Sequence, residues 1–276
     1  MYRLIASDLD ETLLNDEHQI CEANRQAIKE ATARGIKFVP ATGRGYTSIT
    51  NVLEALDLKD KENEYVLSFN GCALTENKGN RLLAFEGLDF DIARQLFEFG
   101  LNRDVCIHVY TLDDVYVYRF NDDERERFHR QGTHYTELRE PSIAHLKDEP
   151  IAKVLYENLD VPYLMSLAEE MLPITEGRLC VSYSSNRYVE FNRLGVDKGT
   201  ALLKLASLLD IAPEETIAVG DNFNDLAMLE KAGLSVAAGN AVPEVKAVCD
   251  YVCQATHNDG VLAEVMERFV IPKKGL

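Results

Sequence analysis

Two carboxylates near the start of the chain are the first residues whose types and spacing can do chemistry. Asp8 and Asp10 follow the apolar residues 4–6, which are typical of a buried strand. Two carboxylates held within about 4 Å repel by roughly 4 kcal/mol at an effective dielectric near 20, so a fold that keeps them together usually supplies a cation. A divalent metal is the obvious cation, and a solvated acidic turn is the alternative. The rest of the chain decides between the two.

Later apolar runs also end in polar or Gly-containing turns, and a lysine opens a further helix. The apolar runs at residues 36–39, 65–69 and 216–219 alternate with helical patterns, which indicates an α/β fold with a parallel sheet. Because ligands of such sheets bind beyond the carboxyl ends of the strands, we expect the turn residues to gather there with the acids. These residues are Thr42, Gly43, Asn70, Asp221, Asn224, Asp225 and the lysine, Lys198.

This set of residues favours phosphate chemistry at a metal site. Hard oxygen ligands without His or Cys select Mg²⁺, which is usually held by a few carboxylates plus substrate phosphate. Lys198, Thr42 and backbone amides suit the phosphate oxygens. A metal-held aspartate facing phosphate is a nucleophile, and an acid two residues further lies within reach of the leaving oxygen as a general acid.

Composition limits the class of partner. The chain has 276 residues, 46% of them hydrophobic, and a formal net charge of -17, which argues against nucleic-acid and anionic-membrane surfaces. Its six cysteines form no Cys-x-x-Cys pair and are expected to be reduced thiols. No stretch approaches 18 uncharged apolar residues. We therefore expect a soluble cytoplasmic protein without membrane or nucleic-acid partners, and its oligomeric state stays open.

The middle of the chain differs from both ends in residue composition. It is more charged and aromatic, and its strand candidates at 105–110 and 115–120 flank a short turn that predicts a hairpin. We expect an inserted α+β domain at residues 84–190 and a discontinuous α/β core at residues 1–83 and 191–276. The charged run at residues 122–127 predicts a solvated helix face.

The motifs together resemble the haloacid dehalogenase (HAD) superfamily, and within it the Cof-type sugar phosphatases with an inserted C2 cap. The resemblance covers nearly the whole chain. Four motifs in order carry it, and two later segments, residues 239–241 and 258–261, are also similar to that subfamily. The four are Asp-x-Asp-x-Thr at Asp8 to Thr12, Thr42 in Ala-Thr-Gly-Arg, Lys198 in Asp-Lys-Gly, and Gly-Asp-x-x-Asn-Asp at Gly220 to Asp225.

The resemblance implies a Rossmann-like core, a cap and a role for each acid. Asp8 would attack phosphorus to form an aspartyl phosphate, and Asp10 would protonate the leaving oxygen and later deprotonate water. Mg²⁺ would be held by the Asp8 carboxylate, the Asp10 carbonyl and Asp221, with Asp225 orienting waters or Lys198 behind them.

The resemblance also implies a phosphate site and a substrate class. Thr42, Lys198, Asn224 and the amides of Leu9 and Gly43 would hold the phosphate, and Arg44 and Asn70 are candidates for the substrate side. The substrate would be a small phosphorylated metabolite, with sugar phosphates first. The sequence does not identify it, and the six histidines show no ligand spacing and receive no catalytic role.

One residue departs from the family pattern. Glu11 stands where the family usually has Gly, a residue that tolerates positive φ more readily. We predict that activity survives, because Asp8, Asp10 and Thr12 are intact. Two alternatives stay open: a phosphomutase, which passes the phosphoryl group to another hydroxyl, and a phospho-ligand binding protein without turnover, for which Glu11 is the only support.

Overall fold

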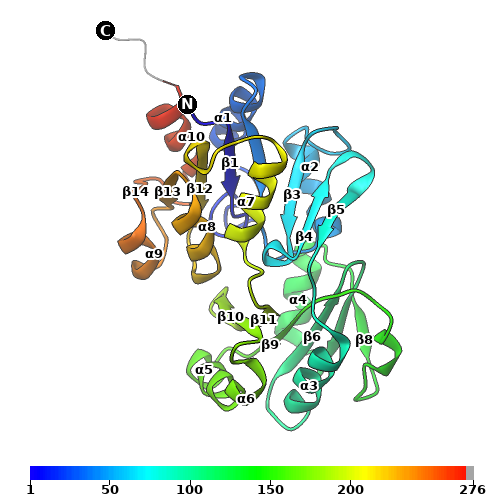
Figure 1. The fold of residues 1–276 in the computed structure, drawn as a ribbon. Helices are drawn as coiled ribbons and strands as arrows, with labels where there is room; N and C mark the ends of the chain where they lie inside the picture. Colours follow the sequence, from blue (N-terminus) through cyan, green and yellow to red (C-terminus); the bar gives the residue numbers. More distant parts are fainter. Residues whose placement is uncertain (272–276) are drawn as a thin grey trace. The chain divides into compact units, whose positions relative to one another are not determined.

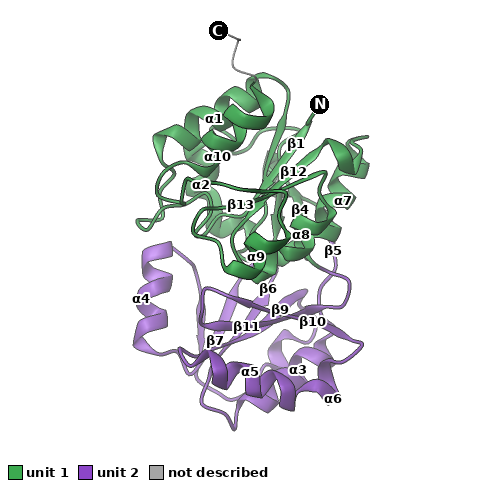
Figure 2. Cartoon of the chain, turned by 90° about the vertical axis from the view of Figure 1, so that its left-hand side faces the viewer, with its two compact units in different colours: residues 1–84, 197–276 green, residues 85–196 purple. Residues whose placement is uncertain are grey.

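The structure is a computed structural model, and it describes residues 1–271. The chain divides into two compact units (Figure 2). Residues 1–84 and 197–276 form the core unit, and residues 85–196 form the insert unit. The second boundary lies after Val196 and not after residue 190, because the last strand of the insert sheet, β11, runs from Tyr188 to Arg193.

A five-stranded parallel sheet organises the core unit (Figure 1). β1 lies between β12 and β2, and the register pairs Ser7 with Val219, so the residues that follow both strands leave the sheet side by side. The spatial order is β14 (Tyr251–Val252), β13 (Leu234–Ala237), β12 (Thr216–Gly220), β1 (Leu4–Ser7) and β2 (Lys37–Pro40).

Helices cover both faces of this sheet, because successive apolar residues of β1 point to opposite faces. In β1, Ile5 belongs to one hydrophobic cluster and Leu4 and Ala6 belong to another. Side chains of α1 (Glu22–Ala33), α2 (Thr50–Ala55) and α10 (Val261–Val265) join the cluster of Ile5. Side chains of α7 (Lys198–Leu208), α8 (Leu226–Lys231) and α9 (Pro243–Val248) join the cluster of Leu4 and Ala6.

The third expected parallel strand lies in a separate sheet, so that part of the prediction is wrong. β3 (Tyr65–Ser68) pairs antiparallel with β4 (Ala73–Glu76), and β5 (Arg81–Phe85) completes a three-stranded sheet. The reason is local: Asn70 at φ 57° and Gly71 at φ 94° turn the chain straight back. Asn-Gly is a strong hairpin signal. An isolated parallel bridge, Ala41 to Leu67, and a hydrogen bond from the Thr42 N–H to the Leu67 carbonyl link β3 to the chain after β2.

The insert unit has a six-stranded sheet of its own. All of its neighbouring strands pair antiparallel except β7 and β8, and the expected hairpin is β6 with β7. The spatial order is β10 (Leu179–Ser184), β11, β9 (Ile151–Glu157), β6 (Cys106–Thr111), β7 (Val115–Tyr118) and β8 (Thr136–Leu138). The helices are α3 (Phe90–Gly100), α4 (Asp122–Gln131), α5 (Val161–Glu170) and α6 (Leu172–Thr175).

The charged run at residues 122–127 does form a helix, α4, but not a purely solvated one. Glu124 is fully buried, where the prediction placed it in solvent. Asn121 caps the helix by accepting a hydrogen bond from the Glu124 N–H at 2.8 Å.

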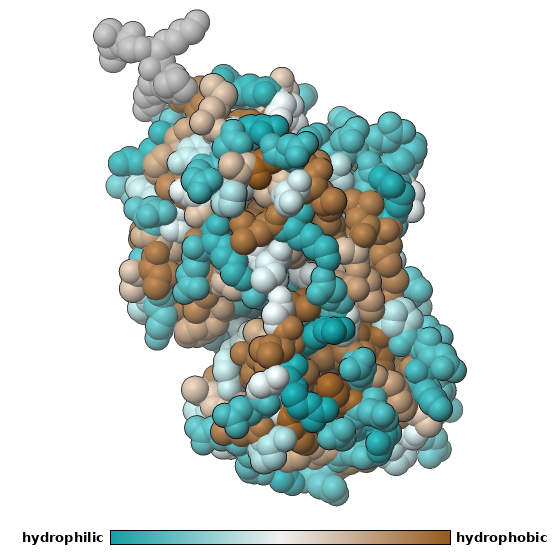
Figure 3. All heavy atoms as spheres, viewed as in Figure 1, coloured by the Kyte–Doolittle hydropathy of each residue, from teal (hydrophilic) through white to brown (hydrophobic). Residues whose placement is uncertain are grey.

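Hydrophilic side chains are spread over the visible face of each unit, with apolar residues between them (Figure 3). Among residues 1–271, no helix is long and apolar enough to cross a membrane. The six cysteines are free thiols. The cytoplasmic location stays a prediction.

Candidate active site

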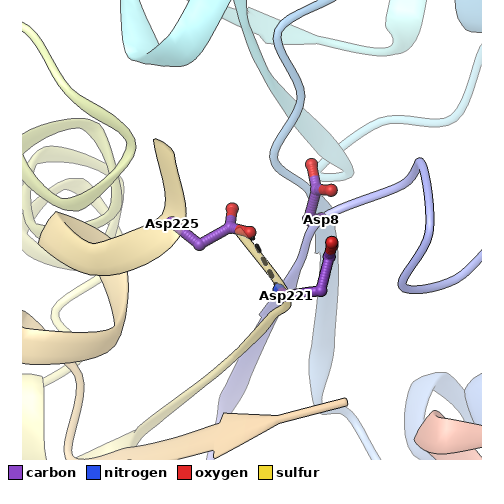
Figure 4. A group of neighbouring side chains, drawn as sticks. All are labelled: Asp8, Asp221 and Asp225. Atoms are coloured by element: carbon purple, nitrogen blue, oxygen red, sulfur yellow. Dashed lines mark hydrogen bonds between the residues drawn. The ribbon is translucent and has the colours of Figure 1, made fainter. Parts of the chain in front are cut away.

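Three buried carboxylates meet at the carboxyl edge of the parallel sheet (Figure 4). Asp8 follows β1, and Asp221 follows the neighbouring strand β12. Asp225 lies one turn further, in the short 3₁₀ helix Phe223–Asp225. Each of the three offers one oxygen atom within 4.8 Å of the others, so the strand ends bring together acids that are more than 200 residues apart in the sequence.

A single ammonium group lies among these acids. Nζ of Lys198 donates to Oδ1 of Asp8 at 2.6 Å and to Oδ1 of Asp225 at 2.7 Å. Lys198 is fully buried and is the first residue of α7. A capping box fixes this helix start, because Asp197 accepts from the Thr200 N–H and the Thr200 hydroxyl accepts from the Asp197 N–H. The helix therefore holds the lysine at the acids.

Both carboxylate oxygens of Asp225 accept hydrogen bonds from protein groups. Its Oδ2 accepts from the backbone N–H groups of Asp221 at 3.0 Å and Asn222 at 3.1 Å, and its Oδ1 faces Lys198. Gly220 permits this close approach, since a Cβ there would lie 2.6 Å from the Asp225 side chain. Asp225 thus orients the lysine and the turn.

The two remaining acids are those that can face a ligand. Asp8 lies at the end of β1, and Oδ1 of Asp221 accepts a hydrogen bond from the Thr12 hydroxyl at 2.6 Å. Thr12 belongs to the first sequence motif, and the sequence analysis gave its side chain no role of its own. Its place in the motif, two residues after Asp10, is the only sequence signal for it.

The pKa shifts in the cluster show that its negative charges outnumber its positive ones. Burial raises the pKa of Asp8 to about 7, with Lys198 opposing the shift and Asp225 and Asp10 adding to it. Burial, followed by the charges of Asp8 and Asp225, also raises the pKa of Asp221 well above its ordinary value. Burial disfavours the charged lysine, but the two aspartates outweigh it and raise the pKa of Lys198.

The donor set fits a divalent cation. Three carboxylates and one ammonium group leave an excess of negative charge when all are ionised, and the donors are hard oxygens. A cation between Asp8 and Asp221 would relieve the repulsion that raises their pKa values. The acidic cluster can therefore bind a metal.

Asp10 points its carboxylate at an arginine. Nε of Arg44 donates to Oδ2 of Asp10 at 2.8 Å, and Nη2 donates to Oδ1. The resemblance implies a substrate-side place for Arg44, whereas its guanidinium faces Asp10. His18, which received no role, has its Nδ1 at 3.7 Å from Oδ1 of Asp10. A local turn, in which the His18 N–H donates to the Asn15 carbonyl, brings it there, and no motif spacing signals this proximity.

Two phosphate-side candidates, Thr42 and Asn224, are hydrogen-bonded to the substrate-side candidate Asn70. Thr42 is buried, and its carbonyl accepts from the Asn70 N–H at 3.0 Å. The Asn224 amide donates to Oδ1 of Asn70 at 3.4 Å. Leu9 is buried and Gly43 is partly exposed. The roles of these residues stay predictions, and the structure brings Thr42, Asn70 and Asn224 together.

Glu11 has the backbone conformation that favours glycine. Its φ is 59°, in the left-handed region. Its carbonyl accepts from the side-chain amide of Asn240 at 2.7 Å, and the same loop is tied at Asp16 to His257 at 2.9 Å and to Asn258 at 3.0 Å. The two late sequence segments that carried the resemblance thus anchor the loop that follows Asp10.

Residues 5–265 match the family of haloacid dehalogenase-like hydrolases. The chain belongs to this family. One relative is the 5-amino-6-(5-phospho-D-ribitylamino)uracil phosphatase YcsE of Bacillus subtilis, which is 29% identical over 98% of this chain and 96% of its own length. Family membership, with phosphatases among the relatives, makes the chain a phosphoric monoester hydrolase.

Solved structures give the same fold. A haloacid dehalogenase-like hydrolase from B. subtilis superposes with a TM-score of 0.87 and 26% identity, covering 97% of this chain and 100% of that one. The HAD subclass IIB sugar phosphatase BT4131 superposes with a TM-score of 0.84 and 21% identity, covering 97% and 98%. This member of the HAD family therefore has the fold of the Cof-type group that its motifs resemble.

Proposed function

We propose that this chain is a Mg²⁺-dependent phosphatase of small phosphorylated metabolites, with sugar phosphates as the first candidates. The observation that carries the proposal is the buried group of Asp8, Asp221 and Asp225 around Lys198 at the edge of the parallel sheet. Carboxylates in this arrangement can hold a metal ion, which together with Lys198 would neutralise a phosphoryl group while the Asp8 carboxylate attacks it.

In the first step the Asp8 carboxylate attacks phosphorus. A bond forms between its oxygen and phosphorus, the bond from phosphorus to the ester oxygen breaks, and Asp10 gives its proton to the departing oxygen. In the second step Asp10 takes a proton from water, which attacks the aspartyl phosphate and releases inorganic phosphate with Asp8 restored. Asp8 thus acts as the nucleophile and Asp10 as the general acid and base.

Other residues of the core unit hold the reacting groups. Asp8, Asp221 and the Asp10 carbonyl would bind Mg²⁺, which supplies positive charge beside the phosphoryl oxygens when bound. Lys198 adds a fixed positive charge and keeps its orientation through Asp225. Thr42, Asn224 and the amides of Leu9 and Gly43 would donate hydrogen bonds to the remaining phosphate oxygens.

The substrate class is proposed at the level of a small phosphorylated metabolite. The relative YcsE is named for a phosphate ester of a ribitylaminouracil, which supports a compact substrate with a polyhydroxylated carbon chain. The excess of acidic residues over the whole chain means that local groups, and not the overall field, must attract an anionic substrate.

A phosphate-release screen tests the proposal. The purified protein is incubated with a panel of sugar, nucleotide and vitamin-precursor phosphates, with Mg²⁺ and with EDTA, and inorganic phosphate is measured. We expect release from several sugar phosphates with Mg²⁺ and little with EDTA. Isomerised product without free phosphate would replace the proposal by a phosphomutase. Binding without turnover on the whole panel would replace it by a ligand-binding protein.

A further inference from the structure

Arg44 and Asp10 form a two-point ion pair within the core unit. Nε of Arg44 donates to Oδ2 of Asp10 at 2.8 Å, and Nη2 of the same guanidinium donates to Oδ1. The side chain of Arg44 is 11% exposed and that of Asp10 is 24% exposed. Two parallel N–H to oxygen bonds fix the plane of a carboxyl group as well as its distance. A single ammonium group would fix only the distance.

Hydrogen bonds at both the N–H and the carbonyl of Arg44 fix its backbone, and this limits where its guanidinium can reach. The Arg44 N–H donates to the Thr42 hydroxyl at 3.1 Å, and the Arg44 carbonyl accepts from the Phe69 N–H at 3.0 Å. The Thr42 N–H in turn donates to the Leu67 carbonyl at 2.8 Å. The loop after β2 is therefore anchored to β3, and the arginine reaches from this anchor to the loop after β1.

Asp10 lies in the loop after β1 and not in the sheet itself. It lies three residues beyond the end of β1, at an isolated bridge to Leu14 and next to Glu11 with its positive φ. A general acid must hold its reacting oxygen within about 3 Å of the leaving oxygen, and small displacements cost large factors in rate. The guanidinium supplies the orientation that the loop does not.

We propose that Arg44 is the positioning residue of Asp10, and that it acts on the reaction through that carboxyl group and not by holding the phosphate. During the reaction one guanidinium N–H stays on one oxygen of Asp10, and the other N–H releases the second oxygen, which carries the proton to the ester oxygen. The inference rests on the proposed phosphatase function. It replaces the substrate-side role that the sequence suggested for Arg44.

The two roles of Arg44 differ in how they depend on the leaving group. An alkyl phosphate such as glucose 6-phosphate needs its leaving oxygen protonated, whereas p-nitrophenyl phosphate leaves as a stable anion. A residue that positions the acid matters more for the first ester. A residue that holds the phosphate, which both esters share, matters equally for both.

The test compares kcat/KM for these two esters in Arg44→Gln, Arg44→Lys and Asp10→Asn, with circular dichroism to verify folding. We expect Arg44→Gln to lose at least about tenfold more on glucose 6-phosphate than on p-nitrophenyl phosphate, in the direction of Asp10→Asn. Arg44→Lys, which keeps the charge but not the two-point geometry, should recover only part of the loss. Equal losses on both esters in Arg44→Gln would overturn the inference and restore the substrate-side role.

A double-mutant cycle sharpens the result. If Arg44 acts through Asp10, adding Arg44→Gln to Asp10→Asn lowers kcat/KM for glucose 6-phosphate by less than about threefold, because the losses are not additive. Fully additive losses would contradict the inference while leaving the phosphatase function intact. A wild-type protein that hydrolyses neither these two esters nor any ester of the screening panel would overturn the proposed function and this inference with it.

Discussion

Each unit of this protein holds three acids close together, and the two groups differ in how their charge is met. In the core unit, Asp8, Asp221 and Asp225 are buried and share the ammonium group of Lys198. In the insert unit, a second group of three acids also has oxygens within 4.8 Å of one another. Its members are Asp123, Glu124 and Glu157.

The acids of the insert unit have partners of their own. Nη1 of Arg187 pairs with Asp123 at 2.5 Å and with Glu124 at 3.1 Å, and the Asn121 amide donates to Glu157 at 2.6 Å. Asp123 is also largely open to solvent, with 52% of its side chain exposed. Solvent screens Asp123, and protein donors bind Glu124 and Glu157, so a bound cation would stabilise this group less than the buried core group.

The difference separates structural from functional acids. A buried carboxylate whose charge is met by groups of the chain contributes to the architecture. Buried carboxylates in excess of their cations lower the stability of the fold unless a bound cation balances their charge. The core group is of the second kind. The following predictions test this contrast, in order of decreasing expected effect.

Replacing the nucleophile gives the largest effect. Asp8→Asn should lower the rate of phosphate release by roughly 10⁴-fold or more, as loss of a nucleophile does in other hydrolases. The measurement is turnover of the best ester from the screen with saturating Mg²⁺. Glu157→Gln is the matched control, because it neutralises one acid of the insert group. Undiminished turnover by Asp8→Asn would remove Asp8 as the nucleophile.

Removing the cation of the insert group should affect stability and not metal binding. Arg187→Met leaves the fully buried Glu124 without its guanidinium, and we expect a loss of about 3 kcal/mol in the free energy of unfolding. Urea denaturation measures it. The Mg²⁺ concentration that gives half-maximal activity should not change. A change in that concentration would mean that the insert acids take part in metal binding.

Mg²⁺ should stabilise the protein more at pH 8 than at pH 5.5. The pKa of Asp8 is raised from 3.8 to about 7, and that of Asp221 is also raised. The metal-free folded state therefore loses stability as the pH rises from about 4 through about 7, since the unfolded chain ionises these carboxyls more readily. A cation binds the ionised carboxylates. At a concentration 100 times its Kd it raises the free energy of unfolding by up to about 2.7 kcal/mol.

Thermal unfolding with and without Mg²⁺ at the two pH values measures this effect. Asp221→Asn should abolish most of the shift in Tm at pH 8, and Glu157→Gln should keep it. A shift that is equal at both pH values, or one that is lost in Glu157→Gln and kept in Asp221→Asn, would contradict the contrast between the two groups.

The smallest effect concerns the loop beside the acids. Glu11→Gly relieves a left-handed backbone position but makes the unfolded chain more flexible, so we expect the free energy of unfolding to change by no more than about 1 kcal/mol. Phosphate release should stay within a few-fold of the wild type. If the wild type proved inert and Glu11→Gly an active phosphatase, the prediction that Glu11 permits activity would be wrong.

Periodicity and motif order predicted much of this architecture. They predicted a parallel sheet, an insert with the β6 and β7 hairpin, and acids of β1 and β12 that meet at one edge, where Lys198 now lies 2.6 Å from Asp8. They failed at β3, because the Asn70-Gly71 turn after this strand sends the chain back into an antiparallel partner, β4. They also failed at Glu124, whose burial depends on a partner 63 residues away, Arg187.

The sequence by itself determined which groups are present: an Asp-x-Asp pair after a strand, a lysine at a helix start and an acidic turn after another strand. These are local patterns, set by residue type and spacing, so they can be read without contacts. Only the tertiary structure decided which oxygen each cation faces. Arg44 pairs with Asp10, and Asp225 orients Lys198, because those distances depend on how distant loops are anchored.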